Sequence, residues 1–214
     1  MIRMTPLITI GIAGGTGAGK TTLVRNLVDH FPDVSVVDLD SYYLDRSHLS
    51  PQERDQLNFD EPSALDLPLL LDQVTRLRHG HVIQKPIYSF GTHCRMGSLK
   101  VQPSSLLVVE GLFVLWWQEL RELLDLKVYL DAPADLRLAR RLRRDVADRG
   151  RSVESILDQY VDAVRIMHEQ FVEPTRHHAD MVLTTTTGHS NDNLAKLFDA
   201  LKVISPTLLP QVAL

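Results

Sequence analysis

The chain has 214 residues, 44% of them hydrophobic, a net charge of −4 and a single cysteine, Cys94. This length predicts one domain over residues 1–214 with one well-buried core, and the negative balance argues against nucleic acid or an anionic membrane as a partner. A lone cysteine excludes an internal disulfide. No apolar run has the length of a membrane span or leads to a cleavage site, so we expect a cytoplasmic protein.

The first predicted element is a strand that runs into a glycine-rich loop. Residues 7–13 are apolar and rich in β-branched side chains, and residues 22–28 place apolar side chains at helical spacing. Between them the sequence fits G-x-x-x-x-G-K-[ST], in which glycines let backbone N–H groups surround a triphosphate. An ordinary glycine turn would not need the Lys-Thr pair that follows. The predicted nucleotide-binding residues of this loop are Gly14, Gly15, Thr16, Gly17, Ala18, Gly19, Lys20, Thr21 and Thr22, with Lys20 on the β- and γ-phosphates and Thr21 on Mg²⁺.

Strands and helices alternate along the rest of the chain, which predicts an α/β fold with a three-layer, doubly wound and mostly parallel sheet. The wholly apolar stretch at 106–109 is typical of a strand that is covered on both faces. Residues 82–101 are expected to form a small β-hairpin. The predicted strands are 34–38, 82–88, 99–101, 106–109, 126–130 and 181–183, and the predicted helices are 64–79, 134–146, 153–171 and 191–203.

Acidic residues follow two of the predicted parallel strands. Asp38 and Asp40 come at the end of one strand, and Glu110 ends another. Ligands of a doubly wound sheet bind outside the carboxyl ends of its strands, where the glycine loop must also lie. A carboxylate at this edge can orient or deprotonate an attacking hydroxyl, or hold Mg²⁺. Capping or turn roles remain the alternatives for Asp40 and Glu110. No N-K-x-D or S-G-G-Q string is present, which argues against a GTPase switch and a transporter-type ATPase.

Arginines are concentrated between residues 137 and 151. The stretch contains seven of them, and 137, 140, 141 and 144 would share one face of a helix. The planar guanidinium group suits charge that is spread over phosphoryl oxygens. We therefore predict a helical lid over the phosphates at 137–151. A solvated charged face is one alternative, and a nucleic-acid patch is another, although the net charge and the lack of interleaved aromatics disfavour it.

Several strings in this chain closely resemble the uridine kinase (uridine–cytidine kinase) family. They include Asp-Ser-Tyr-Tyr at 40–43, Asn-Phe-Asp-x-Pro at 58–62, Tyr-x-Phe-x-x-His-x-Arg at 88–95 and Arg-Gly-Arg at 149–151. The resemblance extends over roughly residues 8–183. The remaining strings are Glu-Gly at 110–111, Arg-Arg-x-x-Arg-Asp at 140–145, Gln-Tyr at 159–160 and Gln-Phe-x-Glu-Pro at 170–174.

This resemblance implies a role for each matching residue. Asp40 is similar to the catalytic base on the nucleoside 5′-hydroxyl, and Arg144 and Arg149 to the lid arginines on the phosphates. A pyrimidine also offers a π-face to an aromatic side chain and polar edge atoms to a histidine, although a core aromatic or a loop histidine would have the same residue type. The residues implied around the nucleoside are Asp60, Arg141 and Gln159 at the ribose, Tyr88 and His93 reading the base, with Phe90 as a second ring, and Arg151 near the base.

Two departures from the family pattern stand out. Family members usually carry proline where this chain has Ile166, so the helix there is expected to be unkinked. After the last strand the family often shows Pro-Arg-Gly-Gly, whereas this chain has Thr-Thr-Thr-Thr-Gly at 184–188. That loop commonly lies beside the donor base, and so the choice between ATP and GTP stays open.

The expected activity is transfer of the ATP γ-phosphoryl group to uridine or cytidine in pyrimidine salvage. Lys20, Asp40 and Arg144 are the predicted catalytic residues, and Thr21, Glu110 and Asp40 the predicted Mg²⁺ ligands. The expected partners are small molecules, and the resemblance implies a homo-oligomer, a tetramer. The alternatives are a phosphoribulokinase-like kinase for another hydroxyl substrate and a catalytically silent regulatory module that binds nucleotide.

Overall fold

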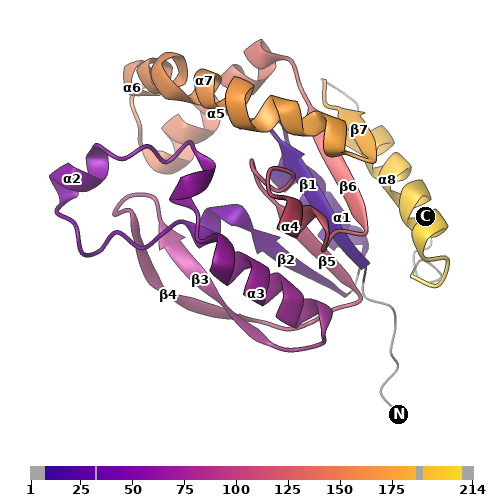
Figure 1. Ribbon diagram of the computed structural model, residues 1–214. Coiled ribbons are helices and arrows are strands. Elements are labelled where there is room, and N and C mark those ends of the chain that lie inside the picture. Colours follow the sequence, from indigo (N-terminus) through magenta and orange to yellow (C-terminus); the bar gives the residue numbers. More distant parts are fainter. Residues whose placement is uncertain (1–7, 32, 187–189, 209–214) are drawn as a thin grey trace.

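Five parallel strands form the central sheet, in the order β2-β5-β1-β6-β7 (Figure 1). All seven residues of β1 (Ile8–Gly14) are buried at the middle of this order. The chain builds β2 and β5 on one side of β1, and then β6 and β7 on the other, so the order reverses at β1 and a ligand site is expected at its carboxyl end. This computed structural model describes residues 8–31, 33–186 and 190–208. The other strands of the sheet are β2 (Val34–Asp38), β5 (Leu106–Glu110), β6 (Leu126–Asp131) and β7 (Met181–Thr184).

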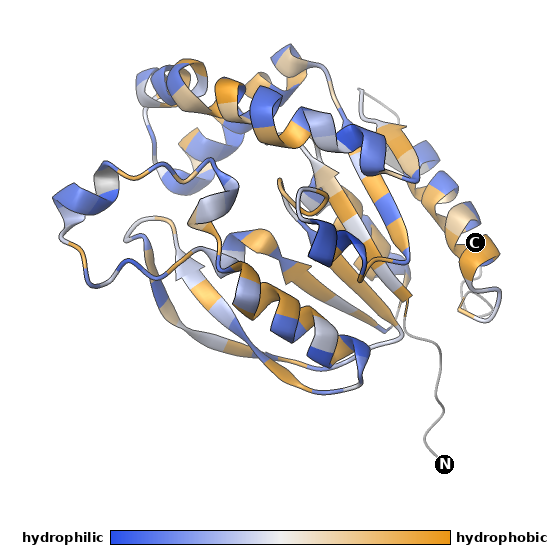
Figure 2. Ribbon diagram, in the orientation of Figure 1, coloured by the Kyte–Doolittle hydropathy of each residue, from blue (hydrophilic) through white to orange (hydrophobic). Residues whose placement is uncertain are grey.

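Helices cover both faces of the sheet, as the apolar strands require. Leu106 and Val108 of β5 pack in a core with α1 (Lys20–His30) and α8 (Ser190–Ile204). Their neighbours Leu107 and Val109 point the other way, into a core with α3 (Leu67–Arg78). Figure 2 shows the apolar colouring concentrated on the strands and on the helix surfaces that meet them. The predicted three-layer α/β fold is therefore confirmed.

The predicted hairpin is present, and its second strand is longer than expected. β3 (Ile83–Ser89) pairs antiparallel with β4 (Cys94–Val101), whereas the sequence predicted a strand only from residue 99. Gly97 lies between the two predicted strands of the hairpin. It lies instead within β4 with φ of 148°, opposite Ile87, where the register shifts.

The predicted helix at 153–171 is present as a continuous helical stretch, but parts of it are π-helical. The π turns at Tyr160–Val164 and His168–Val172 flank α7 (Arg165–Met167). Ile166 continues the helix, as expected for a residue that is not proline, whereas the π turns were not predicted. Among the described residues, none of the helices combines the length and apolar character needed to cross a membrane. The other helices are α5 (Ala134–Arg149) and α6 (Val153–Gln159), together with the short α2 (Pro51–Asp55) and α4 (Gln118–Arg121), which the sequence did not predict.

A 3-10 turn at Leu39–Tyr42 connects β2 to the rest of the molecule and carries Asp40. The Asp38 carboxylate caps this turn and accepts hydrogen bonds from the Ser41 N–H at 2.9 Å and the Ser41 hydroxyl at 2.6 Å. At the other end, the buried Tyr42 hydroxyl donates to Gln73 Oε1 at 2.7 Å. Both ends of the turn are thereby fixed, and the position of Asp40 with them.

We predict that Tyr42→Phe lowers the free energy of unfolding by about 1–3 kcal/mol, because it leaves the buried Gln73 carbonyl oxygen without its donor. Urea unfolding at pH 7 measures this loss. Tyr160→Phe is the control, since the hydroxyl of this half-buried residue makes no recorded hydrogen bond with the described part of the chain, and it should cost less than about 0.5 kcal/mol. Equal small losses in both variants would contradict the role given to the Tyr42 hydroxyl.

Candidate active site

The glycine loop lies between the end of β1 and the start of α1, under the first turns of α5. A Cβ atom added at Gly17, where φ is 74°, would lie 2.3 Å from the Arg137 carbonyl oxygen. A Cβ atom added at Gly15 would lie 2.6 Å from an Arg137 guanidinium nitrogen. Glycine is thus required at these positions because α5 packs directly on the loop.

Lys20 begins α1 and folds back over the loop. Its ammonium group donates to the carbonyl oxygens of Gly14 at 2.9 Å and Gly15 at 3.1 Å. Burial lowers the pKa of Lys20 from its usual 10.5, while the carboxylates of Glu110 and Asp40 act in the opposite direction. The ammonium group therefore lies within electrostatic reach of both predicted carboxylates, Glu110 and Asp40.

Two of the predicted magnesium ligands are in direct contact. The Thr21 hydroxyl donates to Glu110 Oε1 at 3.2 Å, and Glu110 stands at the end of β5, the strand beside β1. Burial raises the pKa of Glu110, and the charge of Lys20 opposes this shift. The prediction that strand-end carboxylates and the glycine loop share one edge of the sheet is confirmed for this pair.

Asp38 and Asp40 are two residues apart, yet their environments shift their pKa values in opposite directions. Burial alone would raise the pKa of Asp38, but the Lys85 ammonium group beside it, from β3, brings that pKa below 3.8. Burial raises the pKa of Asp40 above 3.8, and Lys20 only partly offsets this effect. The Asp40 side chain is nevertheless open to solvent. Asp38 is thus held as a paired structural carboxylate, while Asp40 is accessible for chemistry.

Six of the seven arginines between residues 137 and 151 fall into two groups. Arg137 is buried, and its Nε donates to the Ala132 carbonyl oxygen at 3.1 Å. Arg140 contacts the Gly17 carbonyl oxygen at 3.4 Å and the Thr185 hydroxyl at 3.3 Å. The second group surrounds a carboxylate that the sequence analysis did not single out, and we call it the arginine cluster. It consists of Arg141, Arg144, Arg149 and Arg151, each with a guanidinium nitrogen within 3.8 Å of Asp145.

The residues expected at the ribose form one hydrogen-bonded network around Gln159. Its amide nitrogen donates to Asp60 Oδ2 at 3.1 Å, and its oxygen accepts from Arg141 at 2.8 Å and from Arg151 at 2.6 Å. Arg151 was expected near the base. It instead contacts Gln159, one of the residues expected at the ribose, and Asp145. Burial raises the pKa of Asp60, and the charge of Arg141 opposes this shift.

The hairpin carries an aromatic cluster next to this network. The Tyr88 hydroxyl lies 3.3 Å from His93 Nδ1, and the His93 ring stacks on Phe59 with centroids 4.1 Å apart. Tyr43 packs on Tyr88 with centroids 5.0 Å apart, and the Arg149 guanidinium carbon lies 4.4 Å from the centroid of Phe90. The sequence analysis did not assign roles to Phe59 and Tyr43, although both lie within the strings that carry the family resemblance.

A pocket of about 220 Å³ opens beside the glycine loop. Leu23 and Leu130 supply apolar walls, and Thr22, Arg140, Thr185 and Asn193 supply polar groups. Thr184–Thr186 of the unusual Thr-rich segment are described, whereas residues 187 and 188 lie outside the described residues. A second hollow of about 360 Å³, between β2 and β4, contains none of the predicted site residues.

Comparisons with known proteins identify relatives of this chain. A sequence model of the Phosphoribulokinase / Uridine kinase family matches residues 9–190. The chain belongs to this family. It is 46% identical over 179 residues to a uridine kinase of Brevibacillus brevis, covering 82% of this chain and 84% of that protein. A uridine kinase of Anoxybacillus flavithermus is 43% identical over 185 residues, covering 85% and 87% of the two chains.

Solved structures of P-loop kinases share the fold. Phosphoribulokinase from Rhodobacter spheroides superposes with a TM-score of 0.64 at 15% identity, covering 87% of this chain and 74% of that one. A possible uridine kinase from Bacillus stearothermophilus gives a TM-score of 0.52 at 21% identity, covering 85% of this chain and 91% of that one. At these identities the likeness concerns the fold alone.

Kinases of this family use a divalent cation, and the residues present suit one that is bound mainly through substrate phosphates. The Thr21 hydroxyl and the Glu110 carboxylate supply hard oxygen ligands, and Asp40 is close enough to raise the pKa of Glu110. The described residues include no group of three or more His, Cys, Asp or Glu that could hold a metal by themselves. Mg²⁺ binds in this way, through one or two carboxylates plus phosphates and water.

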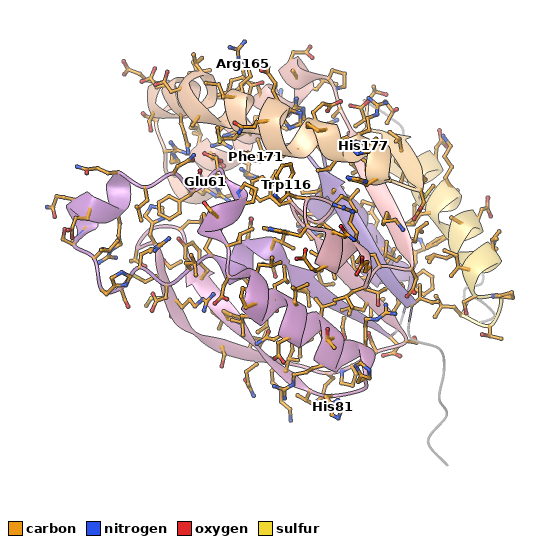
Figure 3. All side chains as sticks on the ribbon, in the orientation of Figure 1. Glu61, His81, Trp116, Arg165, Phe171 and His177 are labelled. Atoms are coloured by element: carbon orange, nitrogen blue, oxygen red, sulfur yellow. The ribbon has the colours of Figure 1, made fainter. Side chains whose placement is uncertain are left out.

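The helical stretch that follows α7 is fixed to β6 behind the glycine loop. His168 Nε2 lies 3.5 Å from Glu173 Oε2, which also accepts from the Tyr129 hydroxyl at 2.8 Å. Trp116 and Phe171 meet edge to face, with ring centroids 5.0 Å apart, and Figure 3 shows them between the α5–α7 layer and the α3 side of the molecule. Burial lowers the pKa of His168 to about 4, with the Arg137 charge acting in the same direction. The ring is therefore neutral at pH 7.

This neutral histidine predicts a pH dependence of stability. Between its folded pKa of about 4 and its ordinary value of 6.5, the unfolded chain binds more protons than the folded one. The contribution of His168 to the free energy of unfolding is therefore fully present above pH 6.5. It is lost as the pH falls toward 4, by up to about 3 kcal/mol. Urea unfolding of the parent and of His168→Gln at several pH values measures the effect.

The difference in unfolding free energy between parent and His168→Gln should shrink as the pH falls through this window. His81→Gln is the control, because His81 is exposed before the hairpin, at the edge of the molecule (Figure 3). If the difference in unfolding free energy from the parent is equally independent of pH for both variants, His168 is not held neutral by the fold.

Proposed function

We propose that this protein is an ATP-dependent uridine/cytidine kinase that forms the nucleoside 5′-monophosphate. The observation that carries this function is that two sets of residues meet: the glycine loop with Lys20 and Asp40, and the aromatic hairpin with the Gln159 network. Arg149 joins them, because it lies over the Phe90 ring and its charge acts on Asp40, and the charge of Asp40 in turn acts on Asp60. Support also comes from curated uridine kinases that are 42–46% identical to this chain over most of its length. We further propose one domain in which residues 82–101 bind the nucleoside and residues 137–151 form the lid.

In the proposed reaction, Asp40 orients the nucleoside 5′-hydroxyl and accepts its proton as the oxygen attacks the γ-phosphorus. A bond forms between the 5′-oxygen and phosphorus, and the bond from phosphorus to the β,γ-bridging oxygen breaks, leaving ADP. Lys20, Arg144 and Arg149 face the charge that develops on the transferring group. Thr21 and Glu110 would hold Mg²⁺ together with the substrate phosphates, and the cation would supply charge neutralisation there. The raised pKa of Asp40 makes it a stronger base than an ordinary carboxylate.

The proposed donor is ATP, with its base in the pocket of about 220 Å³ beside the glycine loop. Leu23 and Leu130 suit the faces of a purine, and the Arg140 and Asn193 side chains suit its edge atoms. This lining is compatible with either purine, so GTP belongs in the same assay.

The nearest rival is a kinase for a phosphorylated sugar, such as the phosphoribulokinase whose fold this chain shares. The aromatic cluster of the hairpin favours a nucleoside, because stacked rings suit a base and offer no charge to a sugar phosphate. A catalytically silent module is disfavoured because Lys20, Asp40 and Arg144 are all present, and their charges act on one another.

We also propose a cytoplasmic homo-oligomer, a tetramer. The hairpin carries exposed apolar side chains at Ile87, Met96 and Leu99, which a second copy of the chain could cover. Light scattering of the purified protein reports its oligomeric state.

Asp40→Asn should reduce kcat by about 10²–10⁴-fold with little change in ATP binding, because it removes the proton acceptor and keeps the shape. Steady-state kinetics with uridine and calorimetric titration with ATP measure the two effects. Asp38→Asn is the matched comparison, since Asp38 pairs with Lys85 and caps the turn. It should lower the free energy of unfolding, and it should reduce kcat by much less than Asp40→Asn does. Near-normal turnover in Asp40→Asn would overturn the assignment.

Uridine and cytidine should both be substrates, within about tenfold in kcat/KM, because a neutral imidazole has one donor and one acceptor nitrogen and can meet either base. Adenosine should react poorly. His93→Ala should lower kcat/KM for both pyrimidines, because the polar edge of either base then loses its partner, at a cost of about 1–3 kcal/mol. The measurement is kcat/KM for the three nucleosides and ribulose 5-phosphate.

His81→Ala is the control for this experiment, because His81 precedes the hairpin, is exposed and lies away from the aromatic cluster. Adenosine or the sugar phosphate as the best substrate would overturn the acceptor assignment. Unchanged kcat/KM for both pyrimidines in His93→Ala would show that another group reads the base.

A further inference from the structure

Asp145 is a fully buried carboxylate in the fourth turn of α5, and it is the common centre of the arginine cluster. Its side chain has 0% exposure. The Nε of Arg144 donates to Oδ1 at 2.8 Å, and an Arg149 nitrogen lies 3.6 Å from the same oxygen. On the other side, Arg141 Nε and an Arg151 nitrogen lie 3.6 and 3.8 Å from Oδ2. One negative charge thus faces four positive ones.

The four arginines reach from this centre to both halves of the site. The charge of Arg144 acts on both Lys20 and Asp40, at the phosphate end. Arg141 and Arg151 both bond Gln159, at the ribose end. A displacement of Asp145 would therefore be transmitted to the donor and acceptor sides together.

The contacts with Asp145 leave Arg144 and Arg149, the two arginines on the phosphate side, most of their N–H donors. A guanidinium group has five N–H donors, and Asp145 engages one edge of Arg144. Asp145 Oδ2 and Arg141 Nε are both buried, and neither has a hydrogen-bond partner among the described residues. Their separation of 3.6 Å is just beyond hydrogen-bond length. A carboxylate that served stability alone would be a poor choice here, since buried charge pairs stabilise weakly. The arrangement orients the guanidinium groups by charge and keeps the N–H donors of Arg144 and Arg149 available for phosphate.

We infer that Asp145 is a positioning residue for phosphoryl transfer, a role that rests on the proposed kinase function. It aims Arg144 and Arg149 at the transferring group and ties their placement to the ribose contacts of Arg141 and Arg151. It does not touch the substrates and acts only through the arginine cluster.

Asp145→Asn tests this role, because the amide keeps the size of the side chain and removes its charge. We expect kcat to fall by about 10²-fold while KM for uridine and for ATP changes less than about fivefold, since misplacement by a fraction of an ångström acts mainly on the transition state. Asp148→Asn is the matched control, an exposed carboxylate one turn further along the same helix, and it should keep the parent kcat. An unchanged kcat in Asp145→Asn would overturn the inference.

A combined variant separates positioning from general destabilisation. If Asp145 acts by aiming Arg144 and Arg149, then adding Asp145→Asn to a variant that already carries Arg144→Ala and Arg149→Ala should slow it by no more than about threefold. A purely structural aspartate would instead give losses that multiply, and that outcome would contradict the inference. Circular dichroism and thermal unfolding establish that each variant is folded.

Asp145→Glu keeps the charge in the buried cluster and provides the test if the asparagine variant does not fold. It moves the carboxylate by one methylene, so kcat should fall by about tenfold with KM nearly unchanged. Parent activity on uridine is measured first, because a parent without nucleoside phosphorylation would overturn the proposed function and not the role of Asp145. In that case the same variants are compared by acceptor-independent ATP hydrolysis, in which the arginines face the same γ-phosphoryl group.

Discussion

The contact between α5 and the glycine loop is the constraint on which the rest of the site depends. The Arg137 carbonyl oxygen occupies the space that a Cβ atom at Gly17 would need, and the Arg137 guanidinium group fills the space beside Gly15. Because α5 starts on the loop, the arginines further along it are carried across the carboxyl ends of the strands. The nucleotide loop and the arginine cluster are thus parts of one rigid arrangement, and a substitution at Gly17 should disturb both.

The sequence predicted the parts of this arrangement that are local or that follow from sheet geometry. The strand, loop and helix around Lys20 are contiguous, and parallel strands place Glu110 beside Thr21 by their direction alone. The Asp60–Gln159 contact joins residues 99 positions apart, so only the family resemblance indicated it. The pairing of Lys85 with Asp38 and the burial of Asp145 depend on which side chain each charge meets after folding. No periodicity or motif expresses that choice.

Asp38 and Asp40 illustrate how one short turn gives two carboxylates different properties. The hairpin contributes Lys85 to Asp38, and that charge keeps Asp38 ionised and bound to the turn that it caps. Asp40 has no such lysine from the hairpin. It meets Lys20 from α1 and, at greater distance, the arginines of α5, so its charge is balanced by the groups that would also balance a triphosphate. The hairpin therefore stabilises the structural carboxylate, and the phosphate-binding elements govern the reactive one.

This distribution of charge explains why the site is ordered before substrates bind. The Lys20 ammonium group is satisfied by the loop carbonyls, Thr21 by Glu110, and the arginine cluster by Asp145 and Gln159. Each of these contacts occupies a group that the proposed mechanism assigns to substrate or metal. Substrate binding would then exchange the bonds of Lys20 and the arginines to protein oxygens for bonds to the charged phosphate oxygens, without first ordering long side chains. The entropy of fixing Lys20 and the arginines has been spent during folding, and the binding free energy of the triphosphate is available for aligning the γ-phosphorus with the 5′-oxygen.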